Sequence, residues 1–312
     1  VSGKVIDPSK VTKEALIGAV DLSTGAETGA QVIRQVYPRL GIVPGLILAP
    51  GWSQIPEVGL ALAAKAAKTN GVYSAMALLD LDTAKAKKYT DTKSGKEESG
   101  YTSPFCYPLW PCDRVGEYIL AKSAVAGAMI QYMASDNEDV PNQSPSNHLL
   151  GVGGQCLEDG TEVYLDQDQA NTVNGYGVTT AINQNGYRLW GNYTGAYPAS
   201  SDAKDIWFAV RRMFSWQGNN FIQTYFDEVD DPMNNVLVQS VVDSENIRCS
   251  AYAPKYWAGA SIEYKSDDNP KTASLAGTMK FRQHIAPYTP AQEIVDIIDY
   301  DTDTLAAAVG GN

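Results

Sequence analysis

The chain has 312 residues, 44% of them apolar and 19% charged, and a net charge of −12 at pH 7. A chain of this length accommodates about two domains, and this composition is typical of a folded globular protein. The excess of acidic residues argues against binding to the phosphate backbone of DNA or RNA, and the lack of a run of about 18 apolar residues argues against insertion into a membrane.

Charge distribution, cysteine content and the first residue give three further expectations. No Lys or Arg occurs from Gln283 to the end, so the C-terminal segment carries acidic charge. The four cysteines show neither CxxC pairs nor metal-ligand spacing; we expect buried free thiols, with a Cys106–Cys112 disulfide as the less favoured alternative. Because the chain begins at Val1 rather than Met, we expect it to be a piece of a longer protein.

The first forty residues carry weak structural signals. Residues 1–13 are polar and weakly patterned, residues 12–20 fit either a short helix or a strand, and residues 21–31 are rich in Gly and Thr, which is typical of a loop. Residues 31–40 predict a helix, because four apolar side chains fall on one helical face: Val32, Ile33, Val36 and Leu40.

The clearest pattern in the chain is a strand, a helix and a second strand. The apolar run 46–49 is followed by Pro56, which is suited to the first turn of a helix because its missing N–H costs nothing there. Asn70-Gly71 predicts the left-handed end of that helix, and residues 72–81 are again almost wholly apolar. We therefore expect a right-handed βαβ unit with a buried parallel sheet.

The rest of the chain is expected to alternate short elements with a few longer helices. Residues 82–89 favour a short helix, residues 90–100 an exposed charged loop, and residues 103–109 a third strand. Further helices are expected over residues 115–135, 166–174, 203–217 and 219–226, and a last one around 236–242, after the acidic run 227–231. Further strands are expected over residues 178–182, 187–190, 256–264, 275–285 and 293–300. The acidic tail 301–312 should be extended and ordered only by a partner.

A search for catalytic residues yields one weak candidate. Ser53 lies between a predicted strand and a predicted helix, where a nucleophile could sit, but its neighbours lack the second glycine of a GxSxG elbow. The two histidines, His148 and His284, show no triad-like context, so structural roles are favoured for both, and a role in the local turn is favoured for Ser53. Because the sequence shows no phosphate loop and no metal-ligand spacing, we expect no cofactor and no metal.

Basic residues form two islands in the C-terminal part of this acidic chain. Arg211 and Arg212 are adjacent in a predicted helix that otherwise buries aromatic residues, and a solvated face and a contact with another subunit explain them equally well. Arg248 and Lys255 form the second island. Such islands often meet acidic surfaces of further copies or of partners.

Several motifs in collinear order resemble one family. They are STGAETGAQ followed by VIRQVYPRLGIVPGLILAPGWS (23–53), SPSN (144–147), GYRLWGNYT (186–194), WFAVRRM (207–213) and IAPYTPAQEIVDIIDYDTDTL (285–305). Together they resemble the contractile tail sheath protein of myophages, being most similar to the P2-like type, and of R-type bacteriocins. The resemblance covers nearly the whole chain from about Asp21.

The resemblance implies a fold and a function. The expected fold is α/β. Residues 1–185 are expected to form a subtilisin-like parallel-sheet domain without a catalytic triad, whose N-terminal arm is absent or shortened. Residues 186–312 are expected to form a smaller α+β C-terminal domain. The second domain is expected to face the tail tube and to end in an extended arm, 301–312. The expected function is that of a structural, non-enzymatic subunit, which polymerises as stacked hexameric rings around a tail tube and contracts to drive the tube through a cell envelope.

The resemblance also implies partners and contact residues. The partners are further copies in a helical polymer, the tail tube protein, and baseplate and tail terminator proteins, in a virion tail assembled in the bacterial host cytoplasm. The candidate tube-facing residues are Arg211, Arg212, Arg248 and Lys255; the candidate arm residues are Asp301, Asp303, Leu305 and Val309, with residues 293–300 as a strand of the acceptor sheet. Two alternatives stay open: an α/β hydrolase-type enzyme that uses Ser53, and a generic capsid-like assembly protein.

Overall fold

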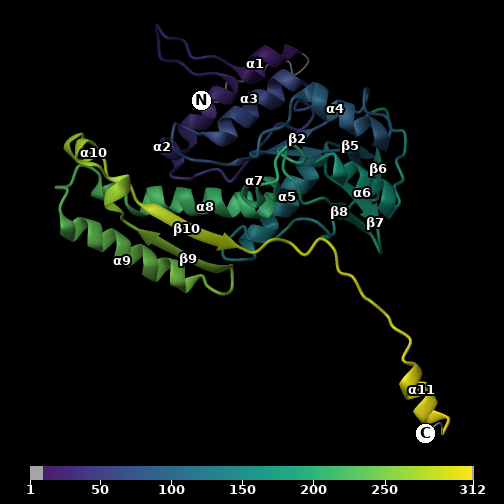
Figure 1. The fold of residues 1–312 in the computed structure, drawn as a ribbon. Helices are drawn as coiled ribbons and strands as arrows, with labels where there is room; N and C mark the ends of the chain where they lie inside the picture. The colour runs from purple at the N-terminus through teal and green to yellow at the C-terminus, as the bar shows by residue number, and fades with distance from the viewer. Residues whose placement is uncertain (1–9, 311–312) are drawn as a thin grey trace.

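A three-stranded parallel sheet lies at the centre of the larger part of the protein (Figure 1). The computed structural model describes residues 10–310, so the start of the expected N-terminal linker and the last two residues of the tail lie outside it. The sheet has the order β1 (Leu46–Leu48), β2 (Met76–Asp80), β3 (Cys106–Leu109), and both pairings are parallel. Helix α3 (Pro56–Ala67) connects β1 to β2, which confirms the βαβ unit expected from the sequence.

Alternate residues of β2 face two different apolar layers. Ala77 and Leu79 belong to a core cluster that includes residues of α3, whereas Met76 and Leu78 belong to a cluster that includes residues of α5 (Lys122–Ser135). Successive side chains of a strand point to opposite faces, so a strand covered on both faces must be apolar at nearly every position. All of β2 is buried, including the acidic residue at its end.

The segment that follows β2 differs from the sequence-based expectation. Residues 82–88 form turns rather than the expected helix, and the expected loop over 90–100 contains the 3-10 helix η3 (Tyr89–Asp91) and the α-helix α4 (Thr92–Ser99). The charged sequence suggested a loop, but Lys96 is buried and its Nζ donates to the backbone oxygens of Tyr176, at 3.0 Å, and Tyr197. These two bonds fasten α4 to the rest of the fold.

The long helix expected over residues 115–135 begins later than predicted. Strands β4 (Cys112–Val115) and β5 (Tyr118–Leu120) form an antiparallel hairpin whose turn places Gly116 at a φ of +59°, and β6 (Gly154–Cys156) pairs with the other side of β4. Helix α5 therefore starts only at Lys122. All four cysteines are free, and three of them are buried.

The remaining elements of this part follow the prediction more closely. They are α1 (Lys13–Ile17), the 3-10 helix η2 (Gly29–Gln35), α2 (Val36–Leu40), α6 (Gln167–Gly175), β7 (Thr180–Asn183) and β8 (Tyr187–Trp190). Strands β7 and β8 pair antiparallel, as expected, with Asn185 and Gly186 at positive φ in the turn between them. The expected domain boundary between residues 185 and 186 falls in this turn.

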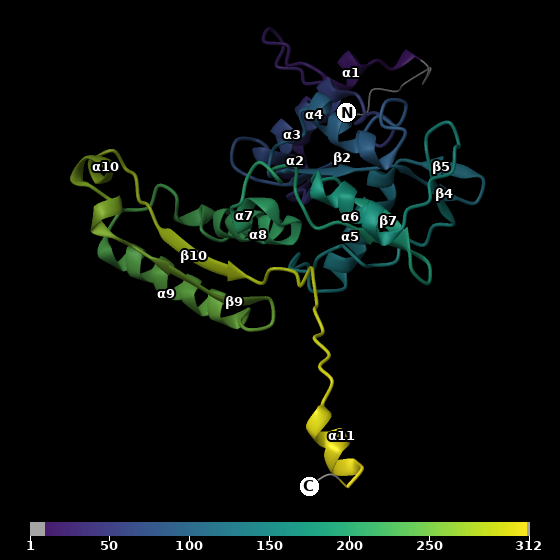
Figure 2. The ribbon, with the colours of Figure 1, turned by 45° about the vertical axis from the view of Figure 1, so that its right-hand side comes forward.

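The C-terminal lobe is a two-stranded antiparallel ribbon that lies between two long helices (Figures 1 and 2). Its elements are α7 (Ala203–Ile206), α8 (Phe208–Thr224), η4 (Phe226–Glu228), α9 (Asn235–Ala251), β9 (Trp257–Glu263), η5 (Ser266–Asp268), α10 (Lys271–Leu275) and β10 (Arg282–Pro287). The expected helix over 203–217 is broken at Trp207, whose backbone is extended, and the helix expected separately over 219–226 is the end of α8. The strand expected over 275–285 starts only at Arg282.

The chain after β10 leaves the rest of the molecule (Figure 2). Residues 288–301 have no regular secondary structure, and α11 (Thr302–Ala308) follows. Two expectations are corrected here: residues 293–300 form no strand, and the tail is helical rather than extended over residues 302–308. The Asp301 side chain caps this helix by accepting from the N–H groups of Asp303 and Thr304, and the alanines that follow favour a helix.

Candidate functional site

A buried polar cluster lies at the carboxyl edge of the parallel sheet, where α/β folds commonly bind ligands. Asp80, at the end of β2, accepts hydrogen bonds from Ser53 Oγ at 2.9 Å, from Ser123 N at 2.8 Å and from Ser123 Oγ at 2.5 Å. Burial raises the pKa of Asp80, and the hydrogen bonds from Ser123 and Ser53 oppose this effect. The cluster fastens the end of β2 to the first turn of α5 and to the segment after β1.

The geometry around Ser53 does not provide a nucleophile. Its side chain is fully buried, and its Oγ donates to Asp80 and accepts from the backbone N–H of Asp80 at 3.0 Å. Within residues 10–310 no histidine is hydrogen-bonded to Ser53; His284 Nε2 lies 2.8 Å from Glu263 Oε1, and burial lowers the pKa of His148. A substrate cannot reach a hydroxyl with no solvent-exposed surface, and both hydrogen bonds of this hydroxyl are made to Asp80, so the geometry gives Ser53 a structural role.

A buried ion pair beside this cluster was missed in the sequence analysis. Lys122 Nζ donates to Asp113 Oδ1, and both side chains are wholly inaccessible to solvent. Burial raises the pKa of Asp113, and the charge of Lys122 opposes this shift. The available signal was a lysine in an alanine-rich apolar stretch. In the described part of the chain, no three His, Cys, Asp or Glu side chains gather as a metal site would require.

Three of the four predicted tube-facing residues are engaged within the chain. Arg211 forms an ion pair with Asp205 at 3.2 Å, and its guanidinium lies over the ring of Phe105 at 4.8 Å. Arg248 is bonded inside the C-terminal lobe, as described below. Lys255 is exposed and forms a surface ion pair with Glu138 at 2.9 Å. Of these three, Lys255 is the one whose charge is open to a partner, and a tube-facing role stays a prediction.

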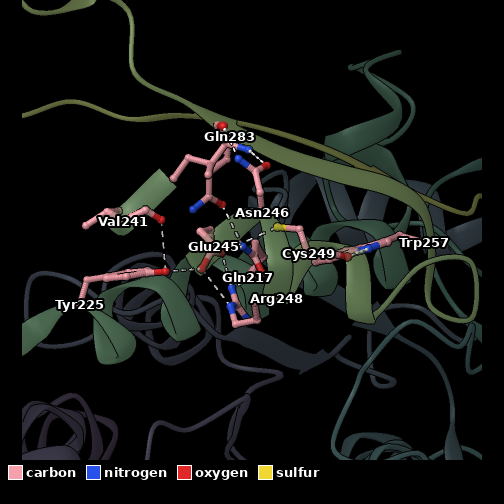
Figure 3. A network of polar contacts seen from close by, with 10 residues as sticks. Gln217, Tyr225, Val241, Glu245, Asn246, Arg248, Cys249, Trp257 and Gln283 are labelled. Atoms are coloured by element: carbon pink, nitrogen blue, oxygen red, sulfur yellow. Dashed lines mark hydrogen bonds and ion pairs between the residues drawn. The ribbon is translucent and has the colours of Figure 1, made fainter. Parts of the chain in front are cut away.

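The bonds of Arg248 belong to a polar network that holds the C-terminal lobe together (Figure 3). Glu245 of α9 is fully buried and accepts from Arg248 Nε at 2.9 Å and from Tyr225 OH at 3.1 Å. Gln217 of α8 donates to Glu245 at 2.6 Å and to Gln283 of β10 at 3.0 Å. The network thus joins α8, α9 and β10, and it explains why a carboxylate is tolerated in this core.

Arg212 has a different environment from its neighbour Arg211. Its side chain faces the interface between α8 and α5, and the residue is only 8% exposed. The guanidinium lies over the ring of Phe208 at 5.6 Å, yet within residues 10–310 it forms no hydrogen bond and no ion pair. Burial alone lowers the pKa of Arg212 to about 10, so the side chain remains charged at neutral pH.

The C-terminal segment exposes apolar side chains that soluble proteins normally cover. Its last hydrogen bond to the lobes joins Tyr193 OH to Gln292 Oε1 at 2.7 Å. Beyond it Ile294, Ile297 and Ile298 are 90%, 80% and 86% exposed. From here on we call residues 293–310 the arm; this segment joins the expected acceptor strand, 293–300, to the described part of the expected arm, 301–312. Of the predicted arm residues, Asp301 caps α11, Asp303 lies in its first turn, Leu305 is about half exposed and Val309 largely exposed.

The ribbon of the C-terminal lobe has one open edge. On β9, Asn246 of α9 accepts from the N–H of Ile262 and donates to its C=O, both at 3.0 Å, as a neighbouring strand would. In the described structure, β10 pairs with β9 alone, so its outer edge has unpaired backbone groups. An open edge of this kind is a template for a strand from another chain.

The fold just described is that of contractile sheath proteins. The chain is similar to a sheath subunit of the extracellular contractile injection system PVC in the contracted state (TM-score 0.69, 17% identity, 89% of this chain and 76% of that chain). It is equally similar to the contracted helical sheath of the anti-feeding prophage AFP (TM-score 0.67, 17% identity, 91% and 76%). The identities are low, so these structures establish the fold alone.

Sequence comparison points in the same direction and confirms the resemblance to tail sheath proteins. The chain is 25% identical to the tail sheath protein of Burkholderia phage BcepMu, over 98% of this chain and 65% of the relative, and 24% identical to that of Escherichia phage P2, over 91% and 69%. It is 30% identical to a putative prophage major tail sheath protein of Pseudomonas aeruginosa, over 64% and 49%. The chain thus spans about half to two thirds of the length of these relatives. No family model matches it.

Proposed function

We propose that this chain is a structural subunit of a contractile tail sheath. In this proposal copies polymerise as stacked hexameric rings around a tail tube, and contraction of the polymer drives the tube through a cell envelope. The observation that carries the proposal is the exposed apolar arm, because burying each isoleucine side chain is worth about 1.5–3 kcal/mol and its own chain does not bury it. The relatives named tail sheath proteins and the contractile sheath fold support the same function.

We also propose the way in which copies are joined. The arm of one copy would add a strand to the outer edge of β10 in another copy, because this edge is open and residues 294–298 are rich in β-branched side chains. The strand expected over residues 293–300 would then form only in the assembly. The same contact would remove the exposed isoleucines from water.

The remaining parts of the proposal concern the rest of the chain. We propose that residues 1–185 form a subtilisin-like domain without a catalytic triad, that residues 186–312 form the inner, tube-facing domain, and that Lys255 is the best placed of the candidate tube contacts. The proposed partners are further copies, the tail tube protein, and baseplate and terminator proteins, in a virion tail assembled in the host cytoplasm. We propose no enzymatic activity, because Ser53 is buried and its hydroxyl is bonded to Asp80 on both sides, as donor and as acceptor.

Negative-stain electron microscopy of the purified chain, with and without tail tube protein, tests this function. The proposal predicts hollow tubes of uniform width whose formation is promoted by the tube protein. Particles of closed or irregular shape would favour a generic assembly protein instead. A matched sample truncated after Gln292 should form no tubes, because it lacks the arm.

A further inference from the structure

A buried arginine without an acidic partner is an unusual feature of this fold. Transfer of a charge from water to a protein interior is costly, and buried arginines are normally paired with carboxylates. Arg212 is only 8% exposed, but within residues 10–310 it has no hydrogen bond and no ion pair, and its guanidinium lies over the face of the Phe208 ring. The neighbouring Arg211, by contrast, has Asp205.

Arg212 lies at a shallow hollow on the junction between the larger part of the protein and the C-terminal lobe. The other lining residues are mostly apolar and come from α5 and from the segment that follows it: Ile130, Met133, Ala134, Val140, Pro141, Gln143 and Pro145. The hollow is too narrow to hold a water molecule in its depth, so a ligand would sit at its mouth, which Arg212 lines. This surface therefore combines one cation with an apolar rim.

The arm has the complementary composition. It carries no basic residue, and acidic residues alternate with exposed apolar ones in the stretch Glu293-Ile294-Val295-Asp296-Ile297-Ile298-Asp299-Tyr300-Asp301-Thr302-Asp303. A carboxylate flanked by isoleucine or tyrosine would suit an arginine flanked by Ile130 and Pro145. Arg–carboxylate bonds can be bidentate and are among the strongest in proteins.

We propose that the hollow at Arg212 receives a carboxylate of Asp299, Asp301 or Asp303 from the arm of a second copy. This inference rests on the proposed function and names a contact within it. It also explains why the isolated chain keeps an uncompensated charge, because the charge is neutralised only on assembly.

The position of Arg212 on α8 fits the open edge of β10. Gln217 of the same helix donates to Gln283 of β10, and Arg212 lies five residues earlier, about 8 Å along the helix axis. Val140, which lines the hollow beside Arg212, packs in the same apolar cluster as Ile285 of β10. One extended segment laid along β10 could therefore reach both the open edge and the hollow.

Binding of a fluorescein-labelled peptide of residues 288–310 to the full chain, followed by fluorescence anisotropy, tests the contact. We expect Arg212→Met to weaken binding at least tenfold, whereas Arg39→Met, which removes an exposed arginine elsewhere, should change it less than twofold. A peptide with Asp299, Asp301 and Asp303 all changed to Asn should bind the wild-type chain as weakly as the normal peptide binds Arg212→Met.

A second readout separates this contact from a merely structural role. Because Arg212 is buried without an acidic partner, Arg212→Met should leave the melting temperature unchanged or raise it while binding falls. Wild-type binding by Arg212→Met, or a lowered melting temperature in both Arg212→Met and Arg212→Gln, would overturn the proposal. Normal tubes from Arg212→Met would refute this contact and leave the proposed sheath function intact. Peptide binding that depends on Arg212 in a wild-type chain that forms no tubes would support the contact and refute the sheath function.

Discussion

The buried pair of Lys122 and Asp113 gives the sharpest prediction about stability. Lys122→Met keeps the length of the side chain but removes the one donor that Asp113 has within residues 10–310, where its second oxygen, Oδ2, already has no hydrogen-bond partner. Breaking one side of a buried ion pair typically costs about 3–5 kcal/mol, because the remaining charge is left in a low-dielectric interior. This is a large part of the roughly 5–15 kcal/mol that stabilises a typical domain.

The assay is urea unfolding followed by tryptophan fluorescence, with the double variant Lys122→Met, Asp113→Leu as the matched control. The double variant should recover most of the loss, since it removes both charges. In the single variant Asp113 would keep a raised pKa in the folded state, so the folded protein binds the extra proton and the deficit should shrink as the pH falls from 7 towards 5. A single variant within about 0.5 kcal/mol of wild type, or a double variant no better than the single one, would refute the reasoning.

Three further predictions follow from buried contacts and from the arm. Burial lowers the pKa of Lys96 to about 8, so the folded state loses this proton at a lower pH than the unfolded state does. The unfolding free energy of wild type should therefore rise relative to that of Lys96→Met as the pH increases from 8 towards 10. The same pH dependence in both proteins would contradict this. Glu245→Leu removes the acceptor shared by Arg248, Gln217 and Tyr225. It should lower the unfolding free energy by about 2–4 kcal/mol and should speed amide hydrogen exchange in the β9–β10 ribbon. Unchanged exchange would show that the ribbon does not depend on the network. Truncation after Gln292 should change the unfolding free energy by less than about 0.5 kcal/mol, because the arm is exposed on its own chain. The truncated protein should sediment as a monomer in sedimentation velocity, whereas the full chain should self-associate. A clearly destabilised monomer would mean that the arm packs on its own chain.

The parts of the fold that the sequence predicted well are those whose pattern is local. The strand at 46–48 and the helix at 56–67 are marked by an apolar run, by Pro56 at the helix start and by Asn70-Gly71 after it, and the structure has both elements with bounds close to those predicted. The hairpin around Asn185-Gly186 is a further example, because the turn residues themselves define it.

The errors occur where a distant contact decides the local structure. Residues 90–100 were expected to be an exposed loop, and the burial of Lys96 against the carbonyl groups of Tyr176 and Tyr197 is not visible in the local sequence. Residues 293–300 have the β-branched composition of a strand, yet a strand needs a neighbouring edge, and in the single chain this segment runs away from the lobes and does not pair with the open edge of β10 (Figure 2). The same reasoning explains why adjacent arginines, Arg211 and Arg212, have different environments.

The candidate sites were predictable to a smaller extent. The sequence favoured a role in the local turn for Ser53, and it did not predict the hydrogen bonds of this side chain to Asp80, 27 residues further along the chain. The tube-facing assignment rested on charge alone, and charge does not reveal that Arg248 is bonded to Glu245 inside the lobe. Pairing of distant residues is a property of the fold, and no spacing in the sequence encodes it.

Cryo-electron microscopy of the polymer formed by the full chain tests the central claim most directly, because it can trace residues 293–303 from one copy to the next. The account predicts a helical tube in which residues 293–300 lie as a strand beside β10 of a second copy, with Asp299, Asp301 or Asp303 at Arg212. A tube in which the arm folds back onto its own chain, or in which β10 keeps an open edge, would contradict it.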